Sequence, residues 1–207
     1  MFIGFDLDGT LLDSRPRHIE VLRHVWPQVD QVLSDQWVHR FWECKLNTGS
    51  TKAFLKMEGV TDASRIAADW VRHIEDLDML ELDTLYPFAV EILTDLSPLN
   101  ELYLVTARGN PGAVKALVER WGLMEFFHGL HVVAPGAGAG KRKAKALPTV
   151  KLDVVVGDTE SDAEWAANCG ARYIPVSWGF RSEKYWSQSN YRFVRDPSKL
   201  VSAIENK

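Results

Sequence analysis

Two carboxylates directly follow a short apolar run at the start of this chain. The run Met1–Phe5 leads into Asp6-Leu7-Asp8-Gly9-Thr10. Apolar surroundings raise the pKa of a carboxyl group, and two neighbouring carboxylates repel each other. Such a placement is costly unless the two acids hold a metal ion, handle a phosphate group, or do both. The alternative is a polar turn after an edge strand, which the remaining sequence makes less favourable.

The elements expected around these acids alternate between strands and helices. Short apolar runs rich in Val and Ile predict strands at Phe2–Phe5, Leu102–Val105, Leu130–Val133, Val154–Val156 and Tyr173–Val176, with a weaker candidate at Arg192–Val194. Helical patterns lie at Phe88–Leu96, Pro111–Trp121 and Ser161–Cys169. This alternation predicts an α/β fold, in which a Rossmann-like parallel sheet carries helices on both faces.

The stretch 14–85 interrupts the alternation, because it contains no convincing strand. Apolar residues at helical spacing, such as Leu22 and Val25, predict amphipathic helices there. We therefore expect two domains along the chain. They are a sheet domain made of residues 1–13 and 87–207, and a helical insert made of residues 14–86.

Polar residues also follow other predicted strands. In open α/β sheets, ligands bind outside the carboxyl ends of the strands. Thr106 follows one strand, and Gly157-Asp158-Thr159-Glu160-Ser161-Asp162 follows another, with the basic run Lys141-Arg142-Lys143-Ala144-Lys145 between them. Each piece has a structural alternative, namely a turn threonine, acids that cap a helix, and a solvated helix face. These alternatives do not explain why all the pieces fall at strand ends in this order.

With these motifs in place, the chain resembles the haloacid dehalogenase superfamily over essentially its whole length. The resemblance is to the Mg²⁺-dependent phosphatase branch with a small helical cap, as in phosphoglycolate phosphatases. The segment 6–10 resembles the first family motif, Thr106 the second, a lysine of 141–145 the third, and 157–162 the fourth.

The resemblance implies a role for each motif residue. Asp6 is expected to attack phosphorus and form an aspartyl-phosphate, while Asp8 acts as general acid and then as general base. Mg²⁺ is expected to bind Asp6, the backbone carbonyl of Asp8, and Asp158, with Asp162 in or just behind the first coordination shell. Thr106 and the adjacent Ala107 are expected at the phosphoryl group. Arg108 either contacts substrate phosphate or pairs with a surface acid.

Three lysines compete for the third motif. Lys143 is favoured because Leu147 follows it at the family spacing of four residues. Lys141 follows the glycine-rich loop and is the second candidate, with an expected place near the phosphate, and Lys145 is the third.

The inserted helices correspond to a cap that closes over the site and selects the substrate. Trp37, Phe41 and Trp42 are expected to pack inside this cap rather than to stack on a substrate. The loop 45–52 either dips toward the phosphate ester or only connects two helices.

The motifs favour one reaction over its alternatives. An acid two residues after the nucleophile is typical of phosphatases and sugar phosphomutases, so we expect a phosphomonoester hydrolase of a small phosphorylated metabolite. The alternatives are a sugar phosphomutase, and a non-catalytic domain that binds a phosphorylated ligand or a protein.

Composition limits the partners. The net charge of −4 gives no electrostatic footprint for a nucleic-acid polymer, and no apolar run approaches the length of a membrane span. The two cysteines, Cys44 and Cys169, form neither a disulfide framework nor a metal-ligand pattern. We expect a cytoplasmic monomer or homodimer with Mg²⁺ as its cofactor.

Overall fold

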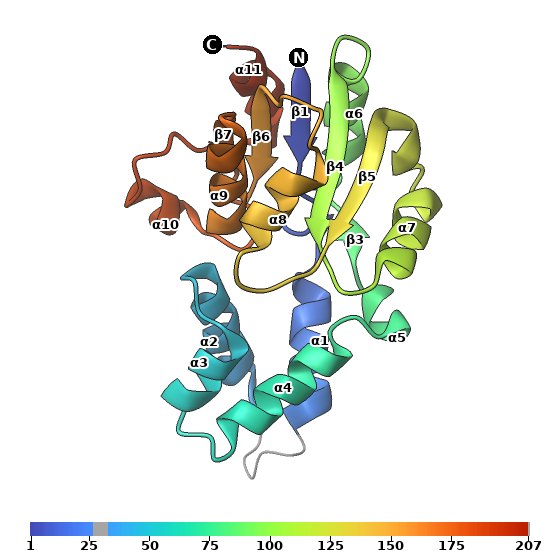
Figure 1. The fold of residues 1–207 in the computed structure, drawn as a ribbon. Helices are drawn as coiled ribbons and strands as arrows, with labels where there is room; N and C mark the ends of the chain where they lie inside the picture. Colours follow the sequence, from blue (N-terminus) through green and yellow to red (C-terminus); the bar gives the residue numbers. More distant parts are fainter. Residues whose placement is uncertain (27–32, 207) are drawn as a thin grey trace.

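A parallel sheet forms the centre of the molecule, whose computed structural model describes residues 1–26 and 33–206. In this part of the chain, five strands pair in the order β5-β4-β1-β6-β7 (Figure 1). They are β1 (Phe2–Phe5), β4 (Glu101–Ala107), β5 (Phe127–Val133), β6 (Val154–Gly157) and β7 (Arg172–Pro175). β1 lies in the middle and runs parallel to both β4 and β6. The predicted parallel sheet is therefore confirmed.

Two strand predictions need correction. β4 extends to Ala107, so Thr106 lies inside the strand near its end rather than after it. The weaker candidate at Arg192–Val194 is wrong as a strand, because only Val194 forms an isolated bridge, with Val176. Arg192 is exposed and Val194 is buried, so the segment offers one buried residue rather than an alternating face.

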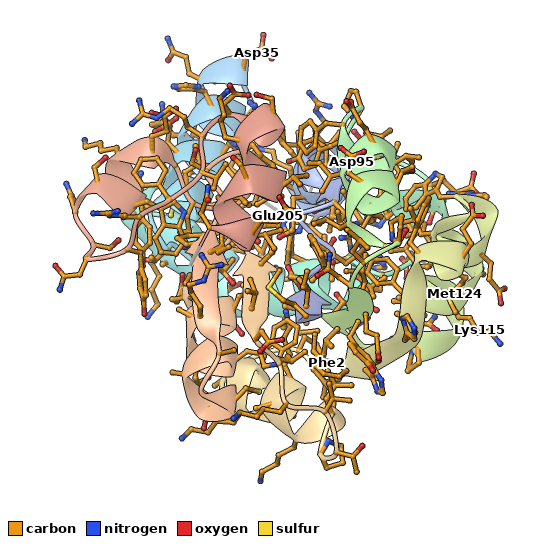
Figure 2. The ribbon with its side chains drawn as sticks, turned by 90° about the horizontal axis from the view of Figure 1, so that it is seen from above. Phe2, Asp35, Asp95, Lys115, Met124 and Glu205 are labelled. Carbon is orange, nitrogen blue, oxygen red and sulfur yellow. The ribbon has the colours of Figure 1, made fainter. Side chains whose placement is uncertain are left out.

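Helices cover both faces of the sheet, as predicted. One face packs against α6 (Ala89–Leu96), α7 (Pro111–Arg120) and α11 (Leu200–Glu205), and the other against α8 (Ala139–Ala146) and α9 (Glu160–Cys169). In the view from above, Asp95 of α6 and Glu205 of α11 mark two helices that pack together (Figure 2). Shorter elements complete this part: the 3₁₀ turns η2 (Leu123–Phe126) and η3 (Pro197–Lys199), and α10 (Glu183–Ser187).

The inserted helices pack around a hydrophobic cluster of their own. They are α1 (Arg15–Val25), α2 (Asp35–Leu46), α3 (Thr51–Met57), α4 (Ala63–His73) and α5 (Leu77–Leu80). Phe41, Phe54 and Ile66 lie in this cluster, which is separate from the clusters that flank the sheet. The helices lie beyond the carboxyl ends of the strands (Figure 1).

A short ribbon joins the inserted helices to the sheet. β2 (Leu12–Asp13) pairs antiparallel with β3 (Thr84–Leu85), where the chain leaves the sheet region and returns to it. The expectation of no strand within residues 14–85 is thus wrong for Thr84–Leu85, a strand that is too short to show a pattern. No helix in the described residues has both the length and the apolarity that crossing a membrane requires.

Candidate active site

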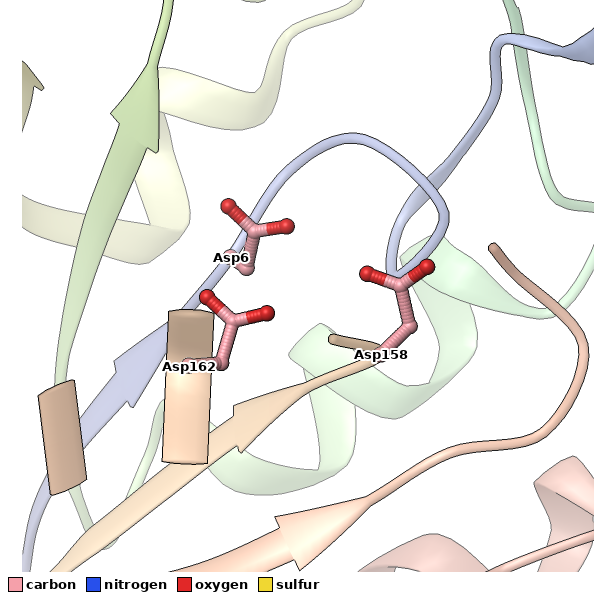
Figure 3. Close-up of side chains that lie close together, drawn as sticks. All are labelled: Asp6, Asp158 and Asp162. Carbon is pink, nitrogen blue, oxygen red and sulfur yellow. The ribbon is translucent and has the colours of Figure 1, made fainter. Parts of the chain in front are cut away.

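Three buried carboxylates meet at the carboxyl edge of the sheet. Asp6 follows β1, Asp158 follows β6, and Asp162 lies in the first turn of α9. Each offers an oxygen within 4.8 Å of the others, and Figure 3 shows the three side chains converging. Because β1 and β6 are neighbours in the sheet, residues about 150 positions apart come together, as the strand-end pattern predicts.

The start of α9 holds Asp162 in place. The backbone N–H and the hydroxyl of Thr159 both donate to its Oδ2, at 3.1 and 2.7 Å. Thr159 is the N-cap of the helix, and the bond from its backbone N–H is one half of a capping box, in which the Thr159 side chain also accepts from the backbone N–H of Asp162. The second oxygen, Oδ1, remains available to the site, and the helix dipole favours negative charge there.

Lys143 is the lysine that contacts the acids. Its Nζ donates to Oδ1 of Asp6 at 2.5 Å and to Oδ1 of Asp162 at 2.7 Å. Burial alone would lower the pKa of Lys143, but the two carboxylates raise it above its ordinary value. Lys141 and Lys145 lie exposed on the same helix. The structure therefore brings the favoured candidate into the acid cluster and leaves the other two outside it.

The acid cluster has the donor set of a hard divalent cation. Burial, and then Asp162, raises the pKa of Asp6 to about 7, while burial, Asp6 and Asp162 raise that of Asp158 well above its usual range. Oδ1 of Asp158 is buried and has no hydrogen-bond partner among the described residues. Three carboxylates share one ammonium group, so a bound cation would balance the remaining negative charge. Oxygen ligands of this kind suit Mg²⁺.

Asp8 has different partners from Asp6. It accepts hydrogen bonds from Nε and Nη2 of Arg108 at 2.7 and 2.5 Å, and from Nη2 of Arg17 at 2.6 Å. Both arginines also donate to the carboxylate of Asp83, Nη2 of Arg108 at 2.8 Å and Nε of Arg17 at 2.9 Å. Burial would raise the pKa of Asp8, but Arg108 and Arg17 hold it well below its usual range. Arg108 thus pairs with acids, but Asp83 is buried rather than on the surface as expected.

Thr106 and Ala107 lie at the same edge of the sheet. β1 pairs with β4 so that Phe5 is opposite Leu104, which places Thr106 beside the segment that carries Asp6. Thr106 is buried, and Ala107 lines a cavity of about 730 Å³ together with Asp8. The second-motif segment is therefore adjacent to the acids.

Contacts between the inserted helices and the sheet region were not anticipated from the sequence. Glu75 accepts hydrogen bonds from the backbone N–H groups of Gly109 and Asn110, both at 2.7 Å. Arg181 pairs with Glu160 and also donates to the backbone carbonyl of Lys45, at 2.7 Å. The loop 45–52 is therefore held to the sheet region through its first residue.

Arg17 is a residue that the sequence analysis missed and that contacts the predicted site through Asp8. It is located four residues before Val21 on α1, and both are buried. A charged residue on an apolar helix face is the signal that could have identified it, because buried arginines are normally paired.

The three aromatic residues of α2 divide between two roles. Trp37 and Phe41 pack in the cluster of the inserted helices, as predicted. Trp42 instead lies 5.5 Å from the ring of Phe180, which belongs to the segment after β7. It therefore packs at the boundary with the sheet region.

Comparisons with known proteins agree with this geometry. A phosphoglycolate phosphatase from Caulobacter vibrioides is 29% identical over 196 residues, which cover 87% of this chain and 81% of that protein. A haloacid dehalogenase-like hydrolase from Streptococcus pneumoniae has a similar structure, with a TM-score of 0.76, 19% identity and coverage of 98% and 97% of the two chains. Protein Tyrosine Kinase A from Mycobacterium tuberculosis also shares the fold, with a TM-score of 0.73, 20% identity and coverage of 98% and 97%.

The family comparison is more specific than the shared fold. The model of the haloacid dehalogenase-like hydrolase family matches residues 2–170, which include β1, β4, β6 and every acid of the cluster. This match confirms the resemblance seen in the motifs. The chain belongs to the haloacid dehalogenase-like hydrolase family.

Proposed function

We propose that the protein is a Mg²⁺-dependent phosphomonoester hydrolase of a small phosphorylated metabolite, working through an aspartyl-phosphate on Asp6. The observation that carries the proposal is the position of Asp6, which contacts Lys143 and shares a buried cluster with Asp158 and Asp162. A carboxylate between an ammonium group and a candidate cation site can approach an anionic phosphate without prohibitive repulsion.

The residues of the chain divide the reaction between them. A carboxylate oxygen of Asp6 forms a bond to phosphorus while the ester P–O bond breaks. Asp8, which Arg108 and Arg17 keep deprotonated while they pair with it, takes up a proton from solvent when it leaves these arginines and gives that proton to the leaving oxygen. Asp8 then takes a proton from the water that attacks phosphorus and releases Asp6. Lys143 and the hydroxyl of Thr106 stabilise negative charge on the phosphoryl oxygens.

The metal ion would be held by Asp6, Asp158 and the backbone carbonyl of Asp8, with Asp162 in or behind the first coordination shell. When bound, it neutralises negative charge on the nucleophile and the phosphoryl group. The third-motif role goes to Lys143 because Lys141 and Lys145 are exposed, and the expected phosphate contact of Lys141 stays a prediction.

We also propose that residues 14–86 act as a cap over a core domain made of residues 1–13 and 87–207. Support comes from the separate hydrophobic cluster of the inserted helices and from the two-residue ribbon at their connections. A cytoplasmic location is proposed because the two cysteines, Cys44 and Cys169, are both free.

Hydrolysis of para-nitrophenyl phosphate tests the proposal. We expect turnover with Mg²⁺, loss of turnover with EDTA, and loss of at least about 10³-fold in Asp6→Asn, because the nucleophile is removed. Asp95→Asn, an exposed acid on α6, is the matched control and should keep wild-type turnover. Activity that survives EDTA, or an active Asp6→Asn, would contradict the mechanism. Phosphoglycolate is the first natural compound to test, because the Caulobacter relative carries its name.

A further inference from the structure

Arginines form part of the lining of a cavity between the inserted helices and the sheet region. Its volume is about 730 Å³, and its lining includes Arg17 and His18 of α1, Trp70 of α4, and Arg108 after β4. Asp8 lies on the same wall. A ligand in this cavity would therefore be in reach of the reacting groups.

The arginines form a balanced network with two acids. Asp8 and Asp83 carry two negative charges, and Arg17 and Arg108 carry two positive charges. Only 3–4% of the arginine side chains is exposed, compared with 18% of Asp8 and none of Asp83. Asp8 is thus the member of the network that can move toward a substrate.

The balance of this network changes when Asp8 leaves it. If Asp8 turns toward the leaving oxygen of a substrate, the two guanidinium groups keep only Asp83 as a partner. Two buried cations with one carboxylate are an unfavourable arrangement, because an unpaired buried charge is costly. A second anion in the cavity would restore the pairing.

Two polar atoms beside this network have no partner in the described part of the chain. They are Nη1 of Arg108 and Nδ1 of His18, and both are buried. Buried polar atoms are normally satisfied, so unpaired polar atoms on the wall of a cavity, among them a guanidinium donor, indicate a missing ligand. The guanidinium group suits a carboxylate or a phosphate, which it can bind through two parallel hydrogen bonds.

The acids that line the same cavity do not exclude an anion. The carboxylate of Glu75 accepts hydrogen bonds from two backbone N–H groups. Oδ2 of Asp76 lies 2.6 Å from Nδ1 of His73. The carboxylate oxygens of both residues therefore already have hydrogen-bond partners outside the cavity's arginine network.

We propose that Arg17 and Arg108 bind a second anionic group of the substrate, so that the preferred substrates are small phosphomonoesters that also carry a carboxylate or a second phosphate. This inference rests on the proposed phosphatase function and narrows its substrate class. The second anion takes the place of Asp8 in the network while Asp8 serves the ester.

Three two-carbon substrates test the proposal without any mutation. Phosphoglycolate carries a carboxylate, ethylene glycol bisphosphate a second phosphate, and 2-hydroxyethyl phosphate an uncharged alcohol. We expect kcat/KM to be about 10- to 100-fold higher for at least one anionic compound than for the alcohol. This ratio corresponds to the free energy of one charge-assisted hydrogen bond. The anionic compound with the higher value identifies the group. Equal values for all three would overturn the proposal while leaving the phosphatase function intact.

A charge-balanced double variant tests the arginine directly. Arg17→Gln combined with Asp83→Asn removes one cation and its buried partner together. We expect the ratio of kcat/KM for the anionic compound over the alcohol to fall at least about tenfold. The control is Arg40→Gln with Glu58→Gln, an ion pair at 2.7 Å within the inserted helices, which should leave the ratio unchanged. An unchanged ratio in the Arg17 variant would overturn the proposal.

Failure of the proposed function gives a different result. A wild-type protein that hydrolyses no phosphomonoester at all refutes the phosphatase activity. Titration calorimetry of the same three compounds then tests the subsite by binding alone. Binding at least about tenfold tighter for an anionic compound supports the subsite, and equal affinities refute it.

Discussion

Replacement of Lys143 by methionine removes the ammonium group that holds the acid cluster together. The group lies 2.5 Å from Asp6 and 2.7 Å from Asp162, and 3% of the lysine side chain is exposed. Methionine keeps an apolar chain of similar length next to Trp165, over whose ring the ammonium lies at 5.4 Å. The change therefore removes charge with little change in packing volume.

The expected loss of stability can be estimated from burial. Removing one partner of a buried ion pair costs about 3–5 kcal/mol, because the other charge stays buried and unpaired. Here three carboxylates remain, and one of them can take up a proton. Because each unit of pKa shift corresponds to about 1.4 kcal/mol, this protonation limits the loss of stability. We therefore expect a loss of about 3 kcal/mol in EDTA.

Saturating Mg²⁺ should reverse most of this loss. A ligand at 100 times its Kd that binds only the folded state adds about 2.7 kcal/mol of stability. Because the lysine no longer competes for Asp6 and Asp162, the variant should gain more from the ion than the wild type does. Turnover should still fall at least about 10²-fold, since a positive group at the phosphoryl site is lost.

Urea unfolding followed by tryptophan fluorescence measures these effects, with EDTA or with Mg²⁺. Lys145→Met is the matched control, because it removes an exposed lysine from the same helix. A loss below about 1 kcal/mol in EDTA, or an equal loss in the control, would refute the role given to Lys143.

Three further predictions concern packing, pH and the boundary between the two parts. In Gly4→Ala the new Cβ would lie 2.6 Å from the Trp165 ring, so unfolding should become easier by about 1–3 kcal/mol, whereas Gly112→Ala, whose Cβ meets nothing closer than 3.6 Å, should not be destabilised. Burial, Lys45 and Arg17 lower the pKa of His18 well below 6.5, so the unfolded state binds more protons than the folded state as the pH falls below 6.5. The wild type should then lose more stability between pH 7 and 5 than His18→Gln does, and parallel urea midpoints would disprove this. Glu75→Gln replaces one acceptor oxygen by an amide donor that faces the backbone N–H groups of Gly109 and Asn110. The free energy of unfolding should fall by about 1 kcal/mol, and KM should rise. If neither quantity changed, the role of Glu75 at the boundary would be contradicted.

Local patterns were sufficient to place the acids of the candidate site. Asp6 and Asp158 each follow a run of apolar residues, and adjacent parallel strands place such residues at one edge of the sheet. The strand-end positions of the acids depend on strand patterns, which the sequence records directly. The family resemblance, through the spacing of Lys143 from Leu147, selected the lysine that the structure brings into contact with Asp6.

The partners of Asp8 could not be predicted in the same way. Arg17 and Asp83 lie at opposite ends of the inserted segment, 66 positions apart, and they meet only because that segment folds back on itself. Periodicity assigns a residue to a helix face but does not say which distant residue it will contact. For this reason the sequence left Arg108 open between a substrate phosphate and a surface acid, and it did not identify Asp8 and Asp83 as the partners.

The central position of β1 has a consequence for biosynthesis. β1 leaves the ribosome before the other four strands of the sheet, but Val156 of β6, the partner of Phe5, lies 156 − 5 = 151 residues later in the chain. At a synthesis rate of about 5–20 residues per second, the edge of β1 that faces β6 lacks its partner for about 8–30 s. Exposed apolar strand edges promote association between chains. The nascent chain should therefore depend on chaperones during this interval, and the cluster of acids proposed to bind the metal cannot assemble until Asp158 and Asp162 have been added.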